Sequence, residues 1–213
     1  MKTLDIDSWR RKEHYHYFKD YDQPFFNLIV KVDISKLKKF TEEHDLSFFL
    51  TSFYVLLKCA NEIEVFRYRM RENGVVIHDE IVGGCPILKN DRTFSFTFLT
   101  YNKSFKEYYR YSDEKVNRIK QGAPFRVDPR DNDDMFHSSI VPWLHFEHFE
   151  HAKNHNSNDS APKFVIGKYE LIGDKWLMPL SVSAHHALMD GIDVADFFEL
   201  FQSIVSKPEL HLS

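Results

Sequence analysis

The feature of the sequence that most restricts the fold is the segment LSFFLTSFYVLLKCANEI, residues 46–63. On a helix, its apolar side chains occupy nearly every face, and such a helix is stable only when other elements cover it. A membrane span is not indicated, because no apolar run approaches the roughly 20 residues that crossing a bilayer requires. The segment therefore predicts a helix buried inside a globular protein.

The composition agrees with such a protein. Hydrophobic residues make up 43% of the 213 residues and charged residues 28%, which is the balance of an ordinary folded domain. The length suits one large domain or two small ones. No linker or repeat divides the chain, so we expect a single domain over 1–213. The 20 phenylalanines, 10 tyrosines and 3 tryptophans predict an aromatic interior with room for an aromatic-lined cavity.

Charge and cysteine content argue against several classes of partner. A net charge of -4 gives no electrostatic reason to expect a nucleic acid or an anionic membrane. Cys59 and Cys85 form neither a disulfide framework nor a metal-binding pair, and we expect both to be buried as small apolar residues. The N-terminus lacks the apolar core of a signal peptide, so we expect a cytoplasmic location.

Strand-like and helix-like segments alternate along the chain. Periodicity and turn residues predict a helix opening at Ser8, helices over 35–44, 104–122 and 193–206, strands at 25–34, 93–101 and 136–149, and hairpins over 66–82 around Asn73-Gly74 and over 163–184 around Gly173-Asp174. Pro142 interrupts the last of these strands, and Asp193 is the expected N-cap of the final helix. The mixture predicts an α/β or α+β fold built on one largely mixed sheet.

The segment SAHHALMDG, residues 183–191, carries the strongest chemical signal. It joins an apolar strand to the final helix, a place where function is common because both ends are held. A neutral imidazole, with an unperturbed pKa near ~6.5, can take a proton from a hydroxyl there. The alternative is structural, in which His185 and His186 are satisfied within the core and Asp190 caps a turn.

The His-His-x-x-x-Asp-Gly motif resembles the active-site motif of the chloramphenicol acetyltransferases and of their wider acyltransferase superfamily. Three other blocks are similar to the same family: DIDSWRRKEHYHYF at 5–18, SSIVPWLHFEHF at 138–149 and GKYELIGDKWLMPLSV at 167–182. The blocks stand in the family's order across nearly the whole chain. The resemblance implies an α/β two-layer sandwich in which helices cover a mixed sheet.

The resemblance also implies a role for each residue of the motif. The second histidine, His186, matches the base that takes the proton of the acceptor hydroxyl during direct attack on acetyl-CoA. Ser139 matches the serine that stabilises the oxyanion. Asp190 and Arg11 match a structural ion pair that holds the loop carrying the base, and His185 is structural.

The resemblance also implies binding contacts and an assembly. The implied contacts are Lys168 and Tyr169 to acetyl-CoA, and Tyr17, Phe18, Phe149 and His151 in the acceptor pocket. Acetyl-CoA is a co-substrate here, and the resemblance implies no permanently bound cofactor and no metal. The acceptor that the resemblance implies is chloramphenicol or a related small hydroxylated molecule. Family members are homotrimers with active sites between subunits, so the same assembly is expected.

The sequence departs from the family pattern around the motif and along the acceptor wall. The positions that differ are Ser183 and Ala184 before the histidines, Ile192 and Asp193 after the glycine, and Val165, which replaces a threonine that helps to hold a water. On the acceptor wall, His151 and Lys153 replace apolar side chains. The base, the oxyanion serine and the ion pair are kept, so the resemblance supports the reaction type more strongly than the substrate.

Two further hypotheses remain open from the residues. A relative that has lost turnover would act as a small-ligand binding protein, although it would have no need to keep all four of the implied site residues. A metal site at His145, His148 and His151 is disfavoured, because a spacing of three suits neither one strand face nor a helical i,i+4 pair.

Overall fold

A seven-stranded mixed sheet forms one layer of the computed structural model, which describes residues 1–125, 133–152 and 159–212. The strands run in the order β2 (Phe25–Asp33), β10 (Lys175–His185), β8 (Lys163–Gly167), β7 (Met135–Val141), β5 (Val82–Leu88) and β6 (Phe94–Leu99), and β9 (Glu170–Ile172) pairs with β10. Strand β7 is parallel to both β5 and β8, whereas the remaining pairs are antiparallel. The predicted mixed sheet is therefore confirmed.

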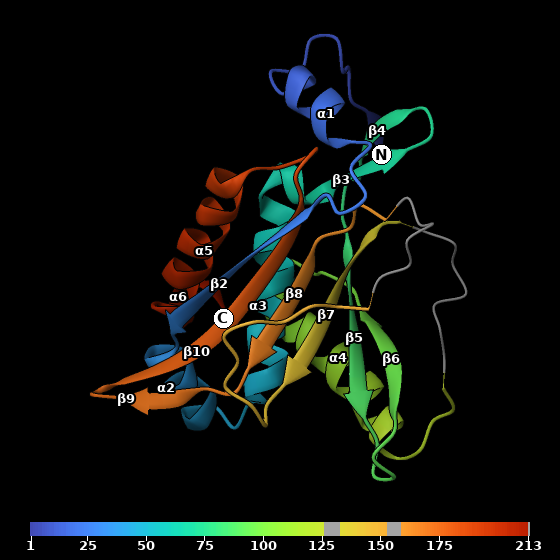
Figure 1. Ribbon diagram of the computed structural model, residues 1–213. Coiled ribbons are helices and arrows are strands. Elements are labelled where there is room, and N and C mark those ends of the chain that lie inside the picture. The colour runs from blue at the N-terminus through green and yellow to red at the C-terminus, as the bar shows by residue number, and fades with distance from the viewer. Residues whose placement is uncertain (126–132, 153–158, 213) are drawn as a thin grey trace.

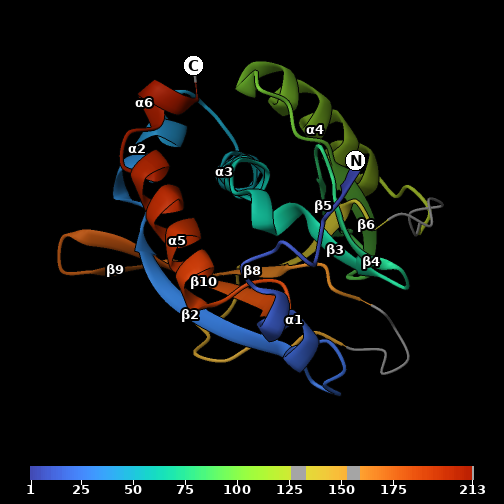
Figure 2. The same ribbon diagram turned by 90° about the horizontal axis from the view of Figure 1, so that it is seen from above.

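Helices cover one face of this sheet (Figures 1 and 2). These helices are α2 (Ser35–Glu43), α3 (Phe48–Glu62), α4 (Phe105–Lys120), α5 (Gly191–Val205) and α6 (Pro208–His211), with a 3-10 turn at Glu64–Arg67. Helix α1 (Lys12–Phe18) lies apart from them at one end of the sheet (Figures 1 and 2). Helix α3 lies between helices α4 and α5 on this face (Figure 2), and its side chains from Phe53 to Leu57 are completely buried. The buried helix predicted from 46–63 is confirmed. Within the described ranges, no helix is long and apolar enough to cross a bilayer.

The hairpin predicted around Asn73-Gly74 forms a separate small sheet. It consists of β3 (Tyr68–Arg71) and β4 (Gly74–Ile77), and β1 (Lys2–Thr3) pairs with β4. Strand β5, which follows, is not predicted from the sequence, because Gly83, Gly84 and Pro86 are residues that weaken a strand. Gly83 is required there, since a Cβ atom would lie 2.6 Å from the buried Phe53 ring.

Two predicted helix starts are wrong by a few residues. The Ser8 hydroxyl donates to Asp5 at 2.8 Å and so belongs to a turn, and α1 begins only at Lys12. Asp190, not Asp193, is the N-cap of α5. Asp193 instead accepts a hydrogen bond from the Asp190 amide at 2.6 Å, which makes a capping box and extends the helix toward the histidines.

The sheet face opposite the helices is crossed by the segment that follows β7. The predicted strand 136–149 ends before Pro142 and does not resume; residues 142–152 instead pass over β8, where the Lys168 amide donates to the Leu144 carbonyl at 3.0 Å. A Cβ atom on Gly167 would lie 2.6 Å from the Phe146 ring, so only glycine permits this close approach. We call residues 142–152 the strap.

Candidate active site

The two adjacent histidines lie at the end of β10 and on opposite sides of it. Strand β10 ends at His185, and the His186 amide donates to the Pro24 carbonyl at 2.9 Å, which ties the turn to the segment before β2. Since successive strand residues point to opposite faces, the two imidazoles occupy different surroundings. His185 lines a cavity on the strap side, whereas His186 packs toward α1.

His186 is held between aromatic rings and polar groups. Its imidazole is stacked on Phe18 with centroids 4.1 Å apart, and Phe26 lies 4.9 Å away. The Nδ1 atom is 3.4 Å from the Met189 carbonyl oxygen and 3.9 Å from Asp190 Oδ1. These two acceptors favour a proton on Nδ1, which leaves the lone pair on Nε2. The ring is about one-third exposed, at 32%, so it can act as a base toward a neighbouring molecule.

The loop after His186 is tied to the start of α1. Arg11 Nη1 lies 3.3 Å from Asp190 Oδ2, and Arg11 Nη2 donates to the His186 carbonyl at 3.1 Å. The Gly191 amide, followed by the Arg11 guanidinium, holds the pKa of the Asp190 carboxyl below its ordinary value. One arginine thus contacts both the helix cap and the backbone of His186, which fixes where that imidazole points.

His185 is buried and uncharged. Burial lowers the pKa of His185 to about 4, because the charged imidazolium is disfavoured away from water. The Ala187 amide donates to His185 Nδ1 at 3.2 Å, which places the ring proton on Nε2. His185 is therefore a fixed hydrogen-bond donor at neutral pH, beside the edge of the Phe25 ring at 5.2 Å.

Ser139 lies on the strap side of β7. Its neighbour Ser138 points into the interior, where its hydroxyl donates to the Gly84 carbonyl at 2.8 Å. In the sheet register Ser139 pairs with Val165, and Val165 pairs with Ser181 on β10. Two strand spacings of about 4.8 Å and an advance of about 16 Å along β10 then separate Ser139 from His186 by about 19 Å. These two residues do not meet within one chain.

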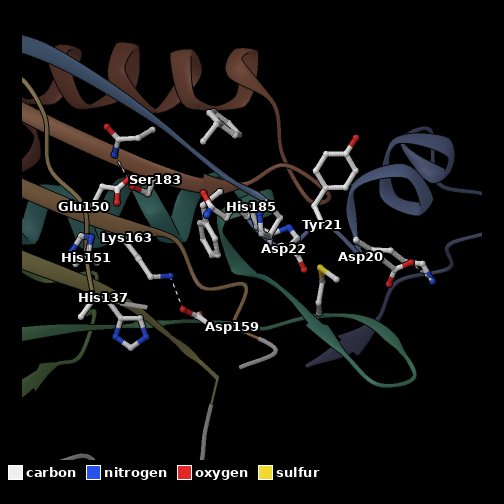
Figure 3. A pocket seen from close by; sticks show the side chains of 18 of the residues that line it. Asp20, Tyr21, Asp22, His137, Glu150, His151, Asp159, Lys163, Ser183 and His185 are labelled. Carbon is white, nitrogen blue, oxygen red and sulfur yellow. Dashed lines mark hydrogen bonds and ion pairs between the residues drawn. The ribbon is translucent and has the colours of Figure 1, made fainter. Parts of the chain in front are cut away.

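A cavity of about 640 Å³ opens on the strap side of the sheet (Figure 3). The connection from α1 to β2, the β3–β4 hairpin and the end of the strap surround it. Phe149 and His151 line this cavity, as does His185. Phe18 does not line it but lies under His186, and Tyr17 is 66% exposed beside Phe18. Lys153 lies outside the described residues.

Several polar residues of the cavity are not anticipated from the sequence. Lys163 Nζ donates to Asp159 Oδ2 at 2.6 Å and to the Ala161 carbonyl at 3.2 Å, and it lies 3.9 Å from the centre of the Phe25 ring. Asn27 donates to the Ser183 hydroxyl at 2.6 Å. The sequence offers one sign of this polar group, because Lys163 begins the otherwise apolar strand KFVIG. On that strand Lys163 shares a face with Val165.

The residues implied to contact acetyl-CoA have different surroundings. Lys168 is exposed just after β8. Tyr169 is partly buried, with its ring edge-on to Phe48 at 5.1 Å and to Trp176 at 5.5 Å. Lys168 is accordingly free to reach a bound molecule by side-chain rotation, whereas Tyr169 contributes mainly to packing at this end of the sheet.

The histidines of the strap and the two cysteines take no part in a metal cluster. His145 lies 3.9 Å from Glu170, and His151 packs against Phe149. Among the residues that the structure describes, no three His, Cys, Asp or Glu side chains converge. Cys59 and Cys85 are both buried, as predicted. Burial raises the pKa of Cys85 to about 12, so this thiol stays protonated at neutral pH.

Known proteins that are similar to this chain in sequence indicate one family. The family model for chloramphenicol acetyltransferase matches residues 1–202. A chloramphenicol acetyltransferase from Proteus mirabilis is 32% identical over 194 residues, which cover 90% of this chain and 88% of the relative. One from Escherichia coli is also 32% identical, over 195 residues and the same shares of both chains.

Solved structures extend the comparison to the fold. A solved chloramphenicol acetyltransferase superposes with a TM-score of 0.85 at 25% identity, covering 96% of this chain and 99% of the other. A probable dihydrolipoamide acetyltransferase from Listeria monocytogenes reaches a TM-score of 0.64 at 16% identity, covering 97% and 95%, which shows a shared fold. The two-layer α/β fold and the acyltransferase class are thus confirmed, and the chain belongs to the chloramphenicol acetyltransferase family.

Proposed function

We propose that this chain is a single-domain enzyme that transfers an acetyl group directly from acetyl-CoA to a hydroxyl of a small acceptor, with His186 as general base. The observation that carries the proposal is the setting of His186. Its ring is stacked on Phe18, its Nδ1 faces the Met189 carbonyl, and Arg11 holds both its backbone and Asp190. A structural histidine would not need an Nε2 lone pair that is oriented by three separate contacts.

The reaction follows from the chemistry of these groups. Nε2 of His186 takes the proton of the acceptor hydroxyl while the oxygen attacks the thioester carbonyl. The Ser139 hydroxyl donates a hydrogen bond to the oxyanion of the tetrahedral intermediate. The carbon–sulfur bond then breaks, and the departing thiolate of CoA takes the proton from the His186 imidazolium. Base catalysis contributes about 10²–10⁴-fold in rate, and one oxyanion donor about 10²–10³-fold.

A complete site is proposed to form between two copies of the chain. The support is geometric: His186 and Ser139 lie about 19 Å apart in one chain, and His186 faces away from the cavity that His185 lines. His186 of one copy would therefore act beside Ser139 and the cavity of another. A homotrimer, the assembly of the family, repeats this arrangement three times with one kind of interface.

The acceptor is proposed to occupy the cavity, with Phe149 and His151 in its wall, and acetyl-CoA to approach Lys168 and Tyr169. Chloramphenicol is the acceptor in the names of the relatives. It or a related small hydroxylated molecule is therefore the first acceptor to test.

The first experiment measures release of CoA thiol from acetyl-CoA with a panel of hydroxylated acceptors that includes chloramphenicol. His186→Ala should lower turnover by at least 10²-fold without unfolding the protein. His185→Ala should be milder, and His211→Ala, in the short C-terminal helix, should have no effect. Near-normal turnover of the His186 variant would refute the mechanism. Binding of acceptor without transfer by the native chain would favour the small-ligand binding protein.

The second experiment tests the site between copies. His186→Ala and Ser139→Ala proteins are each expected to be inactive, and they are unfolded together, mixed and refolded. Random mixing places a native His186 against a native Ser139 at about one quarter of the interfaces. Recovery of about a quarter of native activity supports the proposal. An inactive mixture of correctly assembled protein would show that each chain builds its site alone.

A further inference from the structure

The floor of the cavity carries hydrogen-bonding side chains on three neighbouring strands. Ser183 and His185 project from β10, Lys163 from β8 and His137 from β7, all on the face that the strap crosses (Figure 3). In the register, Lys163 lies directly between Ser183 and His137. This row supplies both donors and acceptors within one patch of the cavity.

The centre of the row is the ion pair of Lys163 with Asp159. The Lys163 side chain is 9% exposed, whereas the Asp159 side chain is 31% exposed, so the carboxylate is the partner that faces the open space. Asp159 accepts hydrogen bonds from Lys163 and from the Ala161 amide. A carboxylate accepts about four hydrogen bonds, so it retains capacity for the hydroxyl groups of a ligand.

Aromatic rings stand next to these polar groups. Phe25 lies between Lys163, 3.9 Å from its ring centre, and His185, 5.2 Å away. Phe149, from the strap, also lines the cavity. Rings beside hydrogen-bonding groups match a molecule that has an apolar C–H face and a rim of hydroxyls. An acceptor that is apolar on all sides would bury the polar row without partners, which is unfavourable.

The charge of the cavity selects against anions. Its described lining includes five acidic and three basic side chains, a net charge of -2. All three cations are close to carboxylates: Lys163 to Asp159 at 2.6 Å, Arg71 to Asp133 at 2.7 Å and Lys19 to Asp20 at 3.9 Å. An anionic ligand would therefore meet a cavity whose described lining is negative overall.

We propose that the acceptor is a multiply hydroxylated, non-anionic molecule of the glycoside class, and that Lys163 with Asp159 forms its specificity-determining subsite. This inference rests on the proposed function, because it assigns the acceptor of that reaction. In this proposal the ion pair positions the sugar ring of the acceptor against Phe25, so that one hydroxyl of the sugar points toward Ser139. Chloramphenicol, with its aromatic ring, is a poorer match to this row.

The experiment compares kcat/KM for a matched set of acceptors: methyl glucoside, its 2-amino counterpart, its uronic acid counterpart and chloramphenicol. The uncharged or amino glycoside should exceed the uronic acid at least tenfold, which corresponds to the loss of one good contact. The double variant Lys163→Met/Asp159→Asn removes both charges at similar volume. It should lower the ratio of glycoside to chloramphenicol at least tenfold, whereas the exposed control pair Lys39→Met/Glu43→Gln should leave it unchanged.

Other outcomes separate the two proposals. Turnover of chloramphenicol with no preference for any glycoside, and with a ratio unaffected by the double variant, would overturn the inference and leave the proposed function standing. If no acceptor is turned over, the proposed function fails, and binding decides the inference. Methyl glucoside binding in calorimetry that is lost in the double variant supports it, and absence of binding overturns it. If the double variant does not fold, Ser183→Ala must lower the same ratio.

Discussion

Replacing Asp190 tests the link between the N-terminal segment and the loop that carries the proposed base. Asp190→Ala removes the N-cap of α5, which costs about 1 kcal/mol, and the partner of Arg11. A fully buried pair would cost about 3–5 kcal/mol to break. Asp190 is 42% exposed, however, and Arg11 13%, so solvent reduces the contribution of the pair to about 1 kcal/mol.

The expected loss for Asp190→Ala is therefore about 2 kcal/mol of unfolding free energy, or about 4–8 °C in melting temperature for a chain of this size. Asp190→Asn keeps a capping oxygen and loses only the charge, so it should lose about half as much. Activity should fall in both, because the His186 backbone is held by the same arginine.

Thermal melts followed by circular dichroism, together with the thiol-release assay, measure both effects. A double-mutant cycle of Arg11→Met with Asp190→Asn should show a coupling energy of about 0.5–1 kcal/mol. Additive effects, or an unchanged melting temperature for Asp190→Ala, would refute the reasoning that this pair holds the loop.

Two further substitutions test the buried side of the site and the core. The pKa of His185 is about 4 in the folded chain, below its ordinary value. The unfolded chain therefore binds more protons between about pH 6.5 and 4, and the free energy of unfolding decreases as the pH is lowered through that window. The native protein should lose free energy of unfolding between pH 7.5 and 5, and His185→Gln should reduce this loss by about 2 kcal/mol. Urea unfolding at each pH measures it, and an equal pH dependence in the native protein and the variant would contradict this. Gly83→Ala places a Cβ atom 2.6 Å from Phe53 and 2.7 Å from Phe136, which should cost about 1–3 kcal/mol. Gly191→Ala, with no atom within 4 Å of the added group, is its control in thermal melts, and equal stability of the two variants would show that the interior yields to the added methyl.

The sequence by itself determined those features that depend on neighbouring residues. The buried helix α3 follows from apolar residues on every face, and the two hairpins follow from Asn73-Gly74 and Gly173-Asp174, because these signals act within a few residues. The motif around His186 was readable for the same reason, since its histidines, aspartate and glycine are contiguous in the chain.

Only the tertiary structure decided which distant residues meet. The family resemblance implied that Arg11 pairs with Asp190, and the folded chain brings the two together across 179 positions. It also places Lys163 and Asp159 in a cavity whose other walls come from the α1–β2 connection and the strap. It also separates Ser139 from His186 by the width of two strands and half the length of β10. Strand order and register arise from packing between segments far apart in the chain. No local pattern encodes them, and so the packing around the base, beyond the Arg11–Asp190 pair that the resemblance implied, could be inferred only from the folded chain.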